Sequence, residues 1–261
     1  MRFLTAFTVL LLFTITCDDD ISVSIEQFKY SEGQKFNYDY TYSFDQNDSI
    51  QVVDSGVFVL EIVSTNSQIG NYFNLIEFKV YNKNTPEFYS KSWYQQSSNG
   101  FYDVAYQNPG IDPGIQPKVM FSKGIDFSRI VLPTFQVNSN YIEITTRSKT
   151  DSITVRDDIR LTAPLPLNLG TESWSEFTNP FTRTSAVTGS RSIKVGGKTE
   201  HVLEITTSFN DSEFDELEYY SYFNEKGLIK RTVIIKDQEI TSENGEFIGY
   251  YDSISEITLR N

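Results

Sequence analysis

The chain has 261 residues, of which 15% are aromatic and 22% are charged, and its formal net charge is −13. This acidic balance argues against binding to nucleic acid, whose phosphates would be repelled, and against a polybasic contact with anionic lipid head groups. The single cysteine excludes a disulfide framework, and the single histidine excludes the usual zinc sites.

Residues 1–16 have the order of charge and hydrophobicity that is typical of a secretory signal. Arg2 supplies a short positive start, and an almost unbroken apolar run extends from Phe3 to Ile15. A helix that crosses a bilayer needs roughly 20 apolar residues, and this run is shorter and is soon followed by three aspartates. We therefore expect residues 1–16 to be a cleaved signal peptide.

Cys17 stands where the apolar run ends, and it is the predicted lipid attachment site. A secreted protein that uses cysteines for folding carries several of them, in pairs, whereas this chain has one. Residues 13–17 resemble the lipobox of bacterial lipoproteins, although Thr14 and Thr16 replace the usual leucine and small residue. The alternative is an ordinary signal peptide with an incidental cysteine. We expect residues 17–29 to be the acylated cysteine and its tether, held stably by more than one acyl chain.

The acidic residues 18–20 bear on localisation. They resemble the signal that sends lipoproteins of the Bacteroidetes group to the outer face of the outer membrane, although in other bacteria an aspartate here resembles an inner-membrane retention signal. We expect a lipid-anchored protein of the cell envelope, in the outer membrane and exposed at the surface. Asp-Ser-Ile segments at 48–50, 151–153 and 252–254 match the short O-glycosylation motif of the same group, but turns that lead into strands are the expected reading.

Residues 30–261 are expected to form an all-β domain, because apolar and polar residues alternate through most of this region. Between Phe36 and Phe44 every second residue is aromatic, which is typical of a half-buried strand. Similar runs predict strands at 57–63, 72–81, 88–94, 101–106, 141–146, 153–161, 202–209, 219–223, 228–235 and 254–259. Hairpin turns are expected at Asn99-Gly100, Gly196-Gly197, Lys226-Gly227 and Asn244-Gly245. Residues 211–222 leave a helix open as the alternative to a strand.

Two breaks divide this domain. Turn-forming residues at 108–114 interrupt the strand pattern, and Pro164-Leu165-Pro166 cannot lie in the middle of a sheet. The possible halves are residues 30–107 and 164–261, with a linking section at 108–163. Both halves contain Leu-Glu-Ile followed by an aromatic strand and a glycine turn, which suggests a duplicated β unit; the alternative is that aromatic meanders resemble one another in general.

Residues 164–236 resemble a broad set of uncharacterised bacterial lipoproteins, and residues 30–104 do so more faintly. The resemblance is carried by Leu165-Pro166-Leu167-Asn168-Leu169-Gly170, Trp174, Tyr219-Tyr220 and Gly227-Leu228-Ile229-Lys230-Arg231. Some of these lipoproteins are similar to the half-barrel folds of lipoprotein carriers, in which a curved antiparallel sheet surrounds an apolar groove. The resemblance implies a curved antiparallel sheet, as a half-barrel or sandwich. Its motifs are structural, so it assigns no functional residue.

Enzyme signatures are missing from the sequence. His201 lies in an alternating strand, where a hydrogen-bonded sheet histidine is expected rather than a catalytic one, and no Gly-x-Ser-x-Gly elbow supplies a nucleophile. The acidic residues between Asp211 and Glu218 suit Ca²⁺, but they lack EF-hand spacing and are expected to form a solvated loop. Two carboxylates that hydrolyse a glycoside must lie at a defined distance in space, which the spacing of acidic residues along the chain does not establish. We expect no enzyme activity, no cofactor and no metal.

Aromatic side chains are the abundant candidates for ligand contact. The residues concerned are Tyr89, Trp93, Tyr94, Tyr102, Tyr219, Tyr220 and Tyr222. They suit a sugar-stacking platform or the wall of an apolar groove, although packing in the sheet is the expected role of most. The expected function is a non-enzymatic binding module for an apolar ligand such as a lipid, attached to the membrane by its anchor. The alternative is a surface glycan-binding or adhesion component, which requires Trp93 or Trp174 to be exposed.

Overall fold

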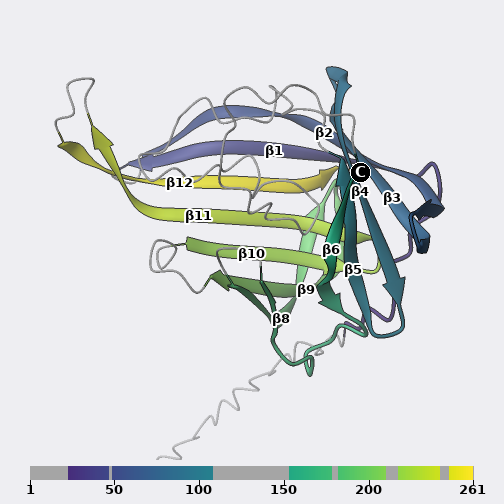
Figure 1. Cartoon of the computed structure of the whole chain (residues 1–261). Coiled ribbons are helices and arrows are strands. Elements are labelled where there is room, and N and C mark those ends of the chain that lie inside the picture. Colours follow the sequence, from purple (N-terminus) through teal and green to yellow (C-terminus); the bar gives the residue numbers. More distant parts are fainter. Residues whose placement is uncertain are drawn as a thin grey trace, which may run out of the picture.

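The computed structural model describes residues 23–46, 49–107, 153–177, 182–209, 217–241 and 247–260. These residues form twelve strands, without a helix among them, in one antiparallel sheet (Figure 1). The expected all-β fold with a curved antiparallel sheet is confirmed. Within these ranges there is no helix that is long and apolar enough to cross a membrane.

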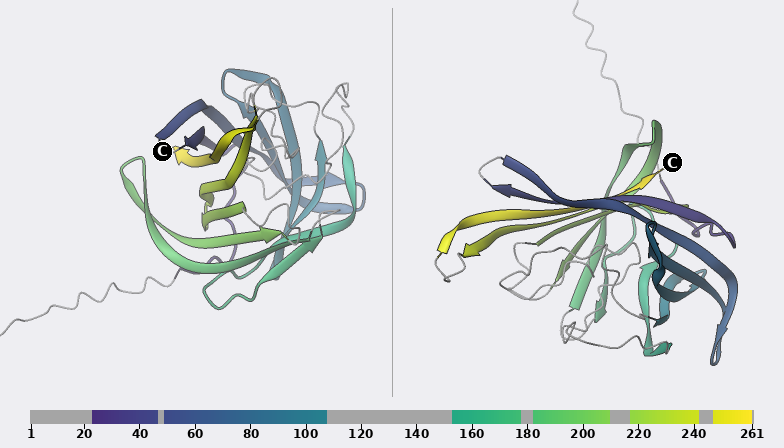
Figure 2. Two further views of the ribbon diagram at one scale, coloured as in Figure 1. Left: turned by 90° about the vertical axis from the view of Figure 1, so that its left-hand side faces the viewer. Right: turned by 90° about the horizontal axis from the view of Figure 1, so that it is seen from above.

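The strands follow one another around the sheet almost without interruption. They are β1 (Lys35–Gln46), β2 (Ser49–Ile69), β3 (Tyr72–Asn82), β4 (Thr85–Ser97), β5 (Gly100–Gln107), β6 (Thr154–Pro164), β7 (Trp174–Phe177), β8 (Thr182–Val195), β9 (Lys198–Phe209), β10 (Leu217–Asn224), β11 (Gly227–Thr241) and β12 (Phe247–Arg260). Consecutive strands pair within β1–β6 and within β7–β12, and β12 pairs with β1. The sheet therefore curves until its edge strands, β6 and β7, approach each other at a single seam (Figure 2).

Alternation in β1 shows how the sequence directs its side chains to the interior. Tyr38 and Tyr40 are buried, and the ring of Tyr38 stacks on Phe58 of β2 with 5.1 Å between the ring centroids. The Tyr38 hydroxyl donates to the carbonyl oxygen of Leu228 over a distance of 2.9 Å. Leu228 is the second residue of β11, which is not adjacent to β1 in the sheet. The aromatic stripe thus joins strands across the interior as well as along the sheet.

Residues 23–30, here called the N-terminal segment, cover one end of the curved sheet. Ile25 exchanges two backbone hydrogen bonds with Leu167, of 2.8 and 3.0 Å. Phe28 is 3% exposed, and its ring lies 5.3 Å from Phe101 and 6.2 Å from Phe223 between centroids. Most of this segment falls in residues 17–29, which the sequence pattern assigned to the tether, yet Ile25 and Phe28 are part of the core. We call this end of the sheet the closed end.

The Gln96 side chain holds the N-terminal segment in place. Its Oε1 accepts from the backbone nitrogen of Phe28 at 2.9 Å, and its Nε2 donates to the Phe28 carbonyl oxygen at 3.2 Å. The next backbone nitrogen, that of Lys29, donates to the carbonyl oxygen of Glu225 at 2.7 Å. Since Gln96 lies near the end of β4 and Glu225 lies between β10 and β11, the segment joins opposite walls of the sheet.

The seam is bridged near the closed end. Trp174 of β7 donates through Nε1 to the carbonyl oxygen of Thr162 in β6 over 3.0 Å, and both residues are buried. Farther along β6, Val155 and Ile159 are 41% and 39% exposed. The two edge strands thus meet at one end and leave part of β6 open to solvent.

Several sequence expectations can be compared with these strands. For residues 211–222 the sequence left a strand or a helix open, and residues 217–224 form strand β10. The prolines at 164 and 166 predicted a break in the sheet, and β6 ends at Pro164. Strands β7 and β8 were not expected, because residues 182–195 are mostly polar. The predicted strand at 141–146 and the turn at Asn244-Gly245 lie outside the described residues. The two halves and their duplication stay predictions.

Candidate functional site

The inward face of β1 and β7–β12 is organised in rows that cross the strands. Directly opposed residues of antiparallel strands share a face, so the pairings between neighbouring strands connect residues of one row. One row runs from Tyr40 through Ile257, Arg231, Ser221 and Ile205 to Val187. The next runs from Tyr42 through Ser255, Val233, Tyr219, Thr207 and Ser185 to Trp174. The interior surface therefore mixes apolar residues with hydroxyl groups and a charge.

We call the polar members of these rows and their inward neighbours the polar layer. They are Arg183, Ser185, Thr207, Tyr219, Ser221, Arg231, Ser253 and Ser255, all of them buried. Ser185 Oγ and Thr207 Oγ1 lie 3.0 Å apart and share a hydrogen bond. Both charged members of the layer are arginines. Buried polar groups need partners or a function, because removing them from water is costly.

Arg231 lies in the first of these rows and is 1% exposed. Its Nε donates to Ser221 Oγ over 3.0 Å, and its guanidinium carbon lies 5.2 Å from the centre of the Tyr219 ring. A guanidinium over an aromatic face is attracted by the negative charge of the ring surface. These contacts fix the plane of the guanidinium, and Arg183 and Arg231 each take part in further contacts besides them.

Electrostatics couple the two arginines of the polar layer. Burial lowers the pKa of Arg231, because a charged group loses hydration in the interior; Tyr219 opposes this shift, and the positive charge of Arg183 adds to it. Arg183 comes from β8 and Arg231 from β11, which two strands separate in the sheet. Both cationic side chains are therefore buried on the inner face of the sheet, although they come from strands that are not neighbours.

The wall formed by β4, β5 and β6 faces the polar layer. Tyr94 is 1% exposed, and its ring stacks on Phe101 with 4.7 Å between centroids. Asp103, which pairs with Tyr94 across β4 and β5, forms a buried ion pair with Arg156 of β6 at 2.6 Å. Arg156 also lies over the ring of Tyr106, 4.7 Å from its centre. This side of the interior is thus polar as well, with its carboxylate matched to a guanidinium.

Two apolar clusters share the inward rows with the polar layer. Toward the closed end is the main core, which includes Phe28, Phe101 and Phe223. In the other direction is a smaller cluster of Tyr42, Tyr219, Val233 and Ile235, against which Phe44, Leu217 and Tyr251 pack while staying partly exposed. We call these seven residues the far-end cluster. Tyr219 belongs to both groups, and Val233 shares a row with Ser255, so the polar residues interleave with the far-end cluster.

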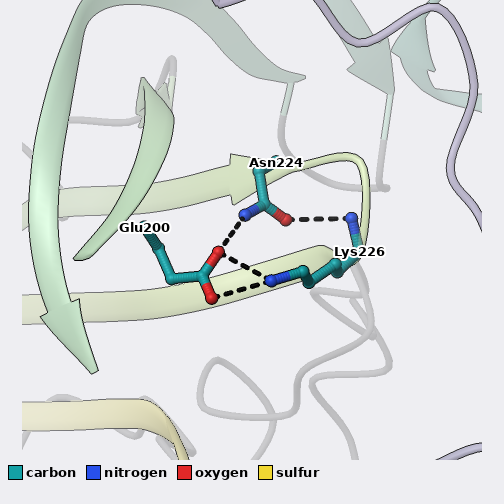
Figure 3. A network of polar contacts seen from close by, with 3 residues as sticks. All are labelled: Glu200, Asn224 and Lys226. Carbon is teal, nitrogen blue, oxygen red and sulfur yellow. Dashed lines mark hydrogen bonds and ion pairs between the residues drawn. The ribbon is translucent and has the colours of Figure 1, made fainter. Parts of the chain in front are cut away.

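A second polar network ties the hairpin of β8 and β9 to the turn between β10 and β11 (Figure 3). Asn224 Nδ2 donates to Glu200 Oε2 at 3.0 Å, and Lys226 Nζ donates to both Glu200 oxygens at 2.7 and 2.9 Å. The Lys226 backbone nitrogen donates to Asn224 Oδ1 at 2.9 Å. Because these hydrogen bonds converge on one carboxylate, the network holds β9 against the turn between β10 and β11. Its role is therefore structural.

The residues that sequence patterns singled out for chemistry do not come together. Cys17 and residues 211–216 of the acidic stretch lie outside the described residues. His201 is exposed on β9, and its Nδ1 shares a hydrogen bond of 3.0 Å with Ser192 Oγ, as expected for a histidine of the sheet. In the described part of the chain, no group of three or more His, Cys, Asp or Glu side chains could hold a metal ion.

The candidate aromatic platform is buried rather than exposed. Trp93 and Trp174 are 3% and 8% exposed, and Tyr94 and Tyr219 are also buried. Tyr102, Tyr220 and Tyr222 are half-buried, and the side chain of Tyr89 lies outside the described residues. The exposed tryptophan that a glycan-binding surface requires is therefore not found at either position. Aromatic side chains here pack the sheet, as was expected of most of them.

The Asp-Ser-Ile segments lie in different settings. Ser253 is in the middle of β12 and is 2% exposed, so this segment is neither a strand start nor accessible to a glycosylating enzyme in the folded chain. In the first segment, Ser49 begins β2 as expected. Asp151 and Ser152 lie outside the described residues.

The sequence predicts Arg231 only as part of a structural motif and gives no indication of Arg183. A signal for Arg231 was present: it interrupts the apolar alternation of Ile229, Val233 and Ile235, which places a charge on an inward position. Arg183 had no such signal, because β8 was not expected. The chain matches no protein-family model, no curated protein and no solved structure.

Proposed function

We propose that this chain is an envelope lipoprotein, acylated at Cys17, that binds an apolar ligand on the inward face of its sheet and catalyses no reaction. The far-end cluster carries the proposal. It extends the inward apolar surface away from the closed end, and three of its members, Phe44, Leu217 and Tyr251, stay partly exposed. Ligand sites are typically apolar walls with a few convergent polar groups, which matches this cluster and the adjacent layer.

The glycan-binding alternative receives less support. Sugar platforms need aromatic faces that water can reach, and both tryptophans of the chain are buried. The exposed aromatic residues in the described ranges include Phe73 and Tyr250, at 54% each, and they belong to different hairpins. We therefore retain the apolar ligand as the proposal and treat glycan binding as a contrasting outcome of its test.

Native mass spectrometry of the full chain, solubilised from the envelope in mild detergent, tests the binding proposal. We expect co-purified lipid that stays attached to the protein. Val233→Trp, which fills the far-end cluster, should lower its occupancy, whereas Val155→Trp on the exposed part of β6 should not. A chain that carries no lipid, takes up none of several added lipids and shifts in mass with polysaccharide fragments would contradict it.

The anchor is tested separately. Radiolabelled palmitate should enter the wild-type chain and not Cys17→Ser, and equal labelling of the two would refute acylation at this cysteine. Protease treatment of intact cells then examines the proposed outer-membrane location and surface exposure. Digestion of the chain without disruption of the cells is expected, while protection until the envelope is broken would place it on an inner leaflet.

A further inference from the structure

A turn at the closed end presents a large apolar side chain to solvent. Leu169 is 53% exposed, whereas Leu167, two residues before it, is buried. Leu169 and Gly170 are the central residues of this turn, in which the backbone nitrogen of Thr171 donates to the carbonyl oxygen of Asn168 at 3.0 Å. Asn168 Oδ1 accepts from the Gly170 nitrogen at 2.8 Å, and Thr171 Oγ1 accepts from the Asn168 nitrogen at 2.9 Å. These hydrogen bonds hold the turn in one conformation with Leu169 outward.

The chain enters the domain close to Leu169. Ile25 and Leu167 form an antiparallel bridge through their two backbone hydrogen bonds. In an antiparallel pair one chain runs backward where the other runs forward. At the bridge, the chain that runs back from Ile25 to Val23 therefore points the same way as the chain that runs forward to Leu169. Each of these paths covers two residues, at most about 7 Å, so the link to Cys17 leaves the closed end beside Leu169.

The closed end is neutral, although the chain as a whole is acidic. Its charged residues are five lysines and five glutamates, and they lie at 23–35, 165–173, 194–200 and 224–227. The turn at 97–100 adds no charge, while the whole chain has a net charge of −13. Anionic lipid head groups repel the acidic remainder of the chain and leave this end without net repulsion. The closed end is thus the part of the molecule best suited to approach a membrane surface.

We propose that Leu169 inserts into the head-group region of the lipid bilayer that holds the acyl anchor of the chain. This inference rests on the proposed acylation of Cys17 and adds to it a direct contact between the folded domain and lipid. An apolar side chain is favoured at the boundary of head groups and acyl chains, because its surface leaves water there. With Cys17 and Leu169 both in the bilayer, the domain has two points of attachment and no longer rotates freely about its link.

Thiol labelling in vesicles tests the contact. The full chain is reconstituted into phosphatidylcholine vesicles as Leu169→Cys or as Ile50→Cys, and a water-soluble maleimide is added from outside. Ile50 is the matched control, because it is 64% exposed and lies opposite Asp45 at the other end of the sheet. We expect the thiol at position 169 to react about ten-fold more slowly or less, since the reactive thiolate is costly to place in the interface. After the vesicles are dissolved and the chain is unfolded in urea, both thiols should react equally fast.

Fluorescence quenching gives a second measurement that does not depend on thiol reactivity. Leu169→Trp and Ile50→Trp each add one indole to Trp93 and Trp174, which are buried in the wild type. In vesicles of phosphatidylcholine that is brominated on its acyl chains near the head group, the added fluorescence of Leu169→Trp should be largely lost. The added fluorescence of Ile50→Trp should persist. Near-ultraviolet circular dichroism would verify that each variant keeps the fold of the wild type.

Each outcome separates the contact from the anchor on which it rests. The wild-type chain should take up no maleimide, because acylation blocks its one cysteine; labelling of the wild type would contradict the proposed anchor, and the contact with it. An unlabelled wild type with equal rates at positions 169 and 50, or with the slower rate at position 50, would overturn the contact and leave the anchor standing. Equal quenching of the two added indoles would overturn it in the same way.

Discussion

Gly227 shows how one residue accommodates the N-terminal segment. Its φ of 109° lies in a region that side chains other than glycine rarely adopt, and a Cβ built there would stand 2.7 Å from the hydroxyl oxygen of Tyr30. Two separate causes therefore require glycine at this turn: the backbone conformation and the close approach of the tyrosine.

Gly227→Ala is expected to destabilise the protein by about 1–3 kcal/mol, the usual cost of a strained backbone position. Denaturant unfolding would measure it. Gly189→Ala is the control, because a Cβ at Gly189 meets nothing within 4 Å, and its unfolding midpoint should barely change. Adding Tyr30→Phe to Gly227→Ala should restore part of the loss; no restoration would mean that backbone strain alone is responsible.

Buried tyrosines make stability depend on alkaline pH. Burial raises the pKa of Tyr38, against a smaller opposing effect of Arg231, and burial also raises the pKa of Tyr42. In the unfolded chain these groups ionise near their ordinary pKa of about 10, whereas in the folded chain they stay protonated at higher pH. Their contribution is thus complete below about pH 10 and declines as pH rises through the folded pKa.

We therefore expect the free energy of unfolding to fall above about pH 10, by up to roughly 1.4 kcal/mol per pH unit for each such tyrosine. Tyrosinate absorbance followed alongside circular dichroism would show it: part of the absorbance should rise only when the protein unfolds. Tyr38→Phe should reduce the slope. Complete ionisation of all tyrosines while the fold persists would contradict this expectation.

At the scale of elements, the N-terminal segment acts as part of the core. Phe28→Ala removes a ring in contact with Phe101 and Phe223 and should cost about 3–5 kcal/mol, since large-to-small changes leave a cavity. Gln96→Ala breaks two hydrogen bonds to the segment and should cost about 1–3 kcal/mol. Phe73→Ala, at a 54% exposed position, serves as the control in thermal unfolding. Similar melting temperatures for Phe28→Ala and Phe73→Ala would contradict the packing.

The seam should be the least protected part of the sheet. β6 and β7 have a neighbouring strand on one side only, whereas β1 and β12 pair with strands on both sides. In native-state hydrogen exchange we expect amides of β6 and β7 to exchange faster than those of β1 and β12. Trp174→Phe, which removes the hydrogen bond to Thr162, should widen the difference. Uniform protection of all four strands would show that the edges are covered.

Much of the sheet could be predicted because its strands alternate. Phe36 to Phe44 and Leu228 to Ile235 contain period-two patterns, and both are strands in the structure. β8 escaped prediction because its residues are polar, and its strand form depends on pairing with β9. The polar layer escaped because it is assembled from one or two residues of each of five strands. Alternation shows which way a side chain points, but which rows meet depends on register.

At the scale of the whole molecule, the proposed anchor sets an orientation. Val23 is six residues after Cys17, a reach of at most about 20 Å for an extended chain. An acylated Cys17 would therefore hold the closed end near the membrane, with the far-end cluster directed away from it. Five residues, 18–22, separate Cys17 from Val23 in the sequence. The packing of Phe28 shows that the chain enters the sheet at the closed end.

Single added cysteines test this orientation, because the chain has one cysteine and acylation would block it. Lys29→Cys lies at the closed end, and Tyr250→Cys lies on the hairpin of β11 and β12 at the other end. A fluorophore at position 29 should transfer energy to a dye in the bilayer more efficiently than one at position 250. Equal efficiencies, or the reverse order, would contradict the orientation.

The burial of Phe28 has a mechanical consequence. With a lipid fixed six residues before Val23, tension between membrane and protein would pass through the backbone of the N-terminal segment directly into the core. The hydrogen bonds from Gln96 to Phe28 and between Ile25 and Leu167 would bear that load before any strand of the sheet did. A pull strong enough to free the segment would uncover the rings of Phe101 and Phe223, so in an anchored chain the stability of the core would limit the force that the attachment withstands.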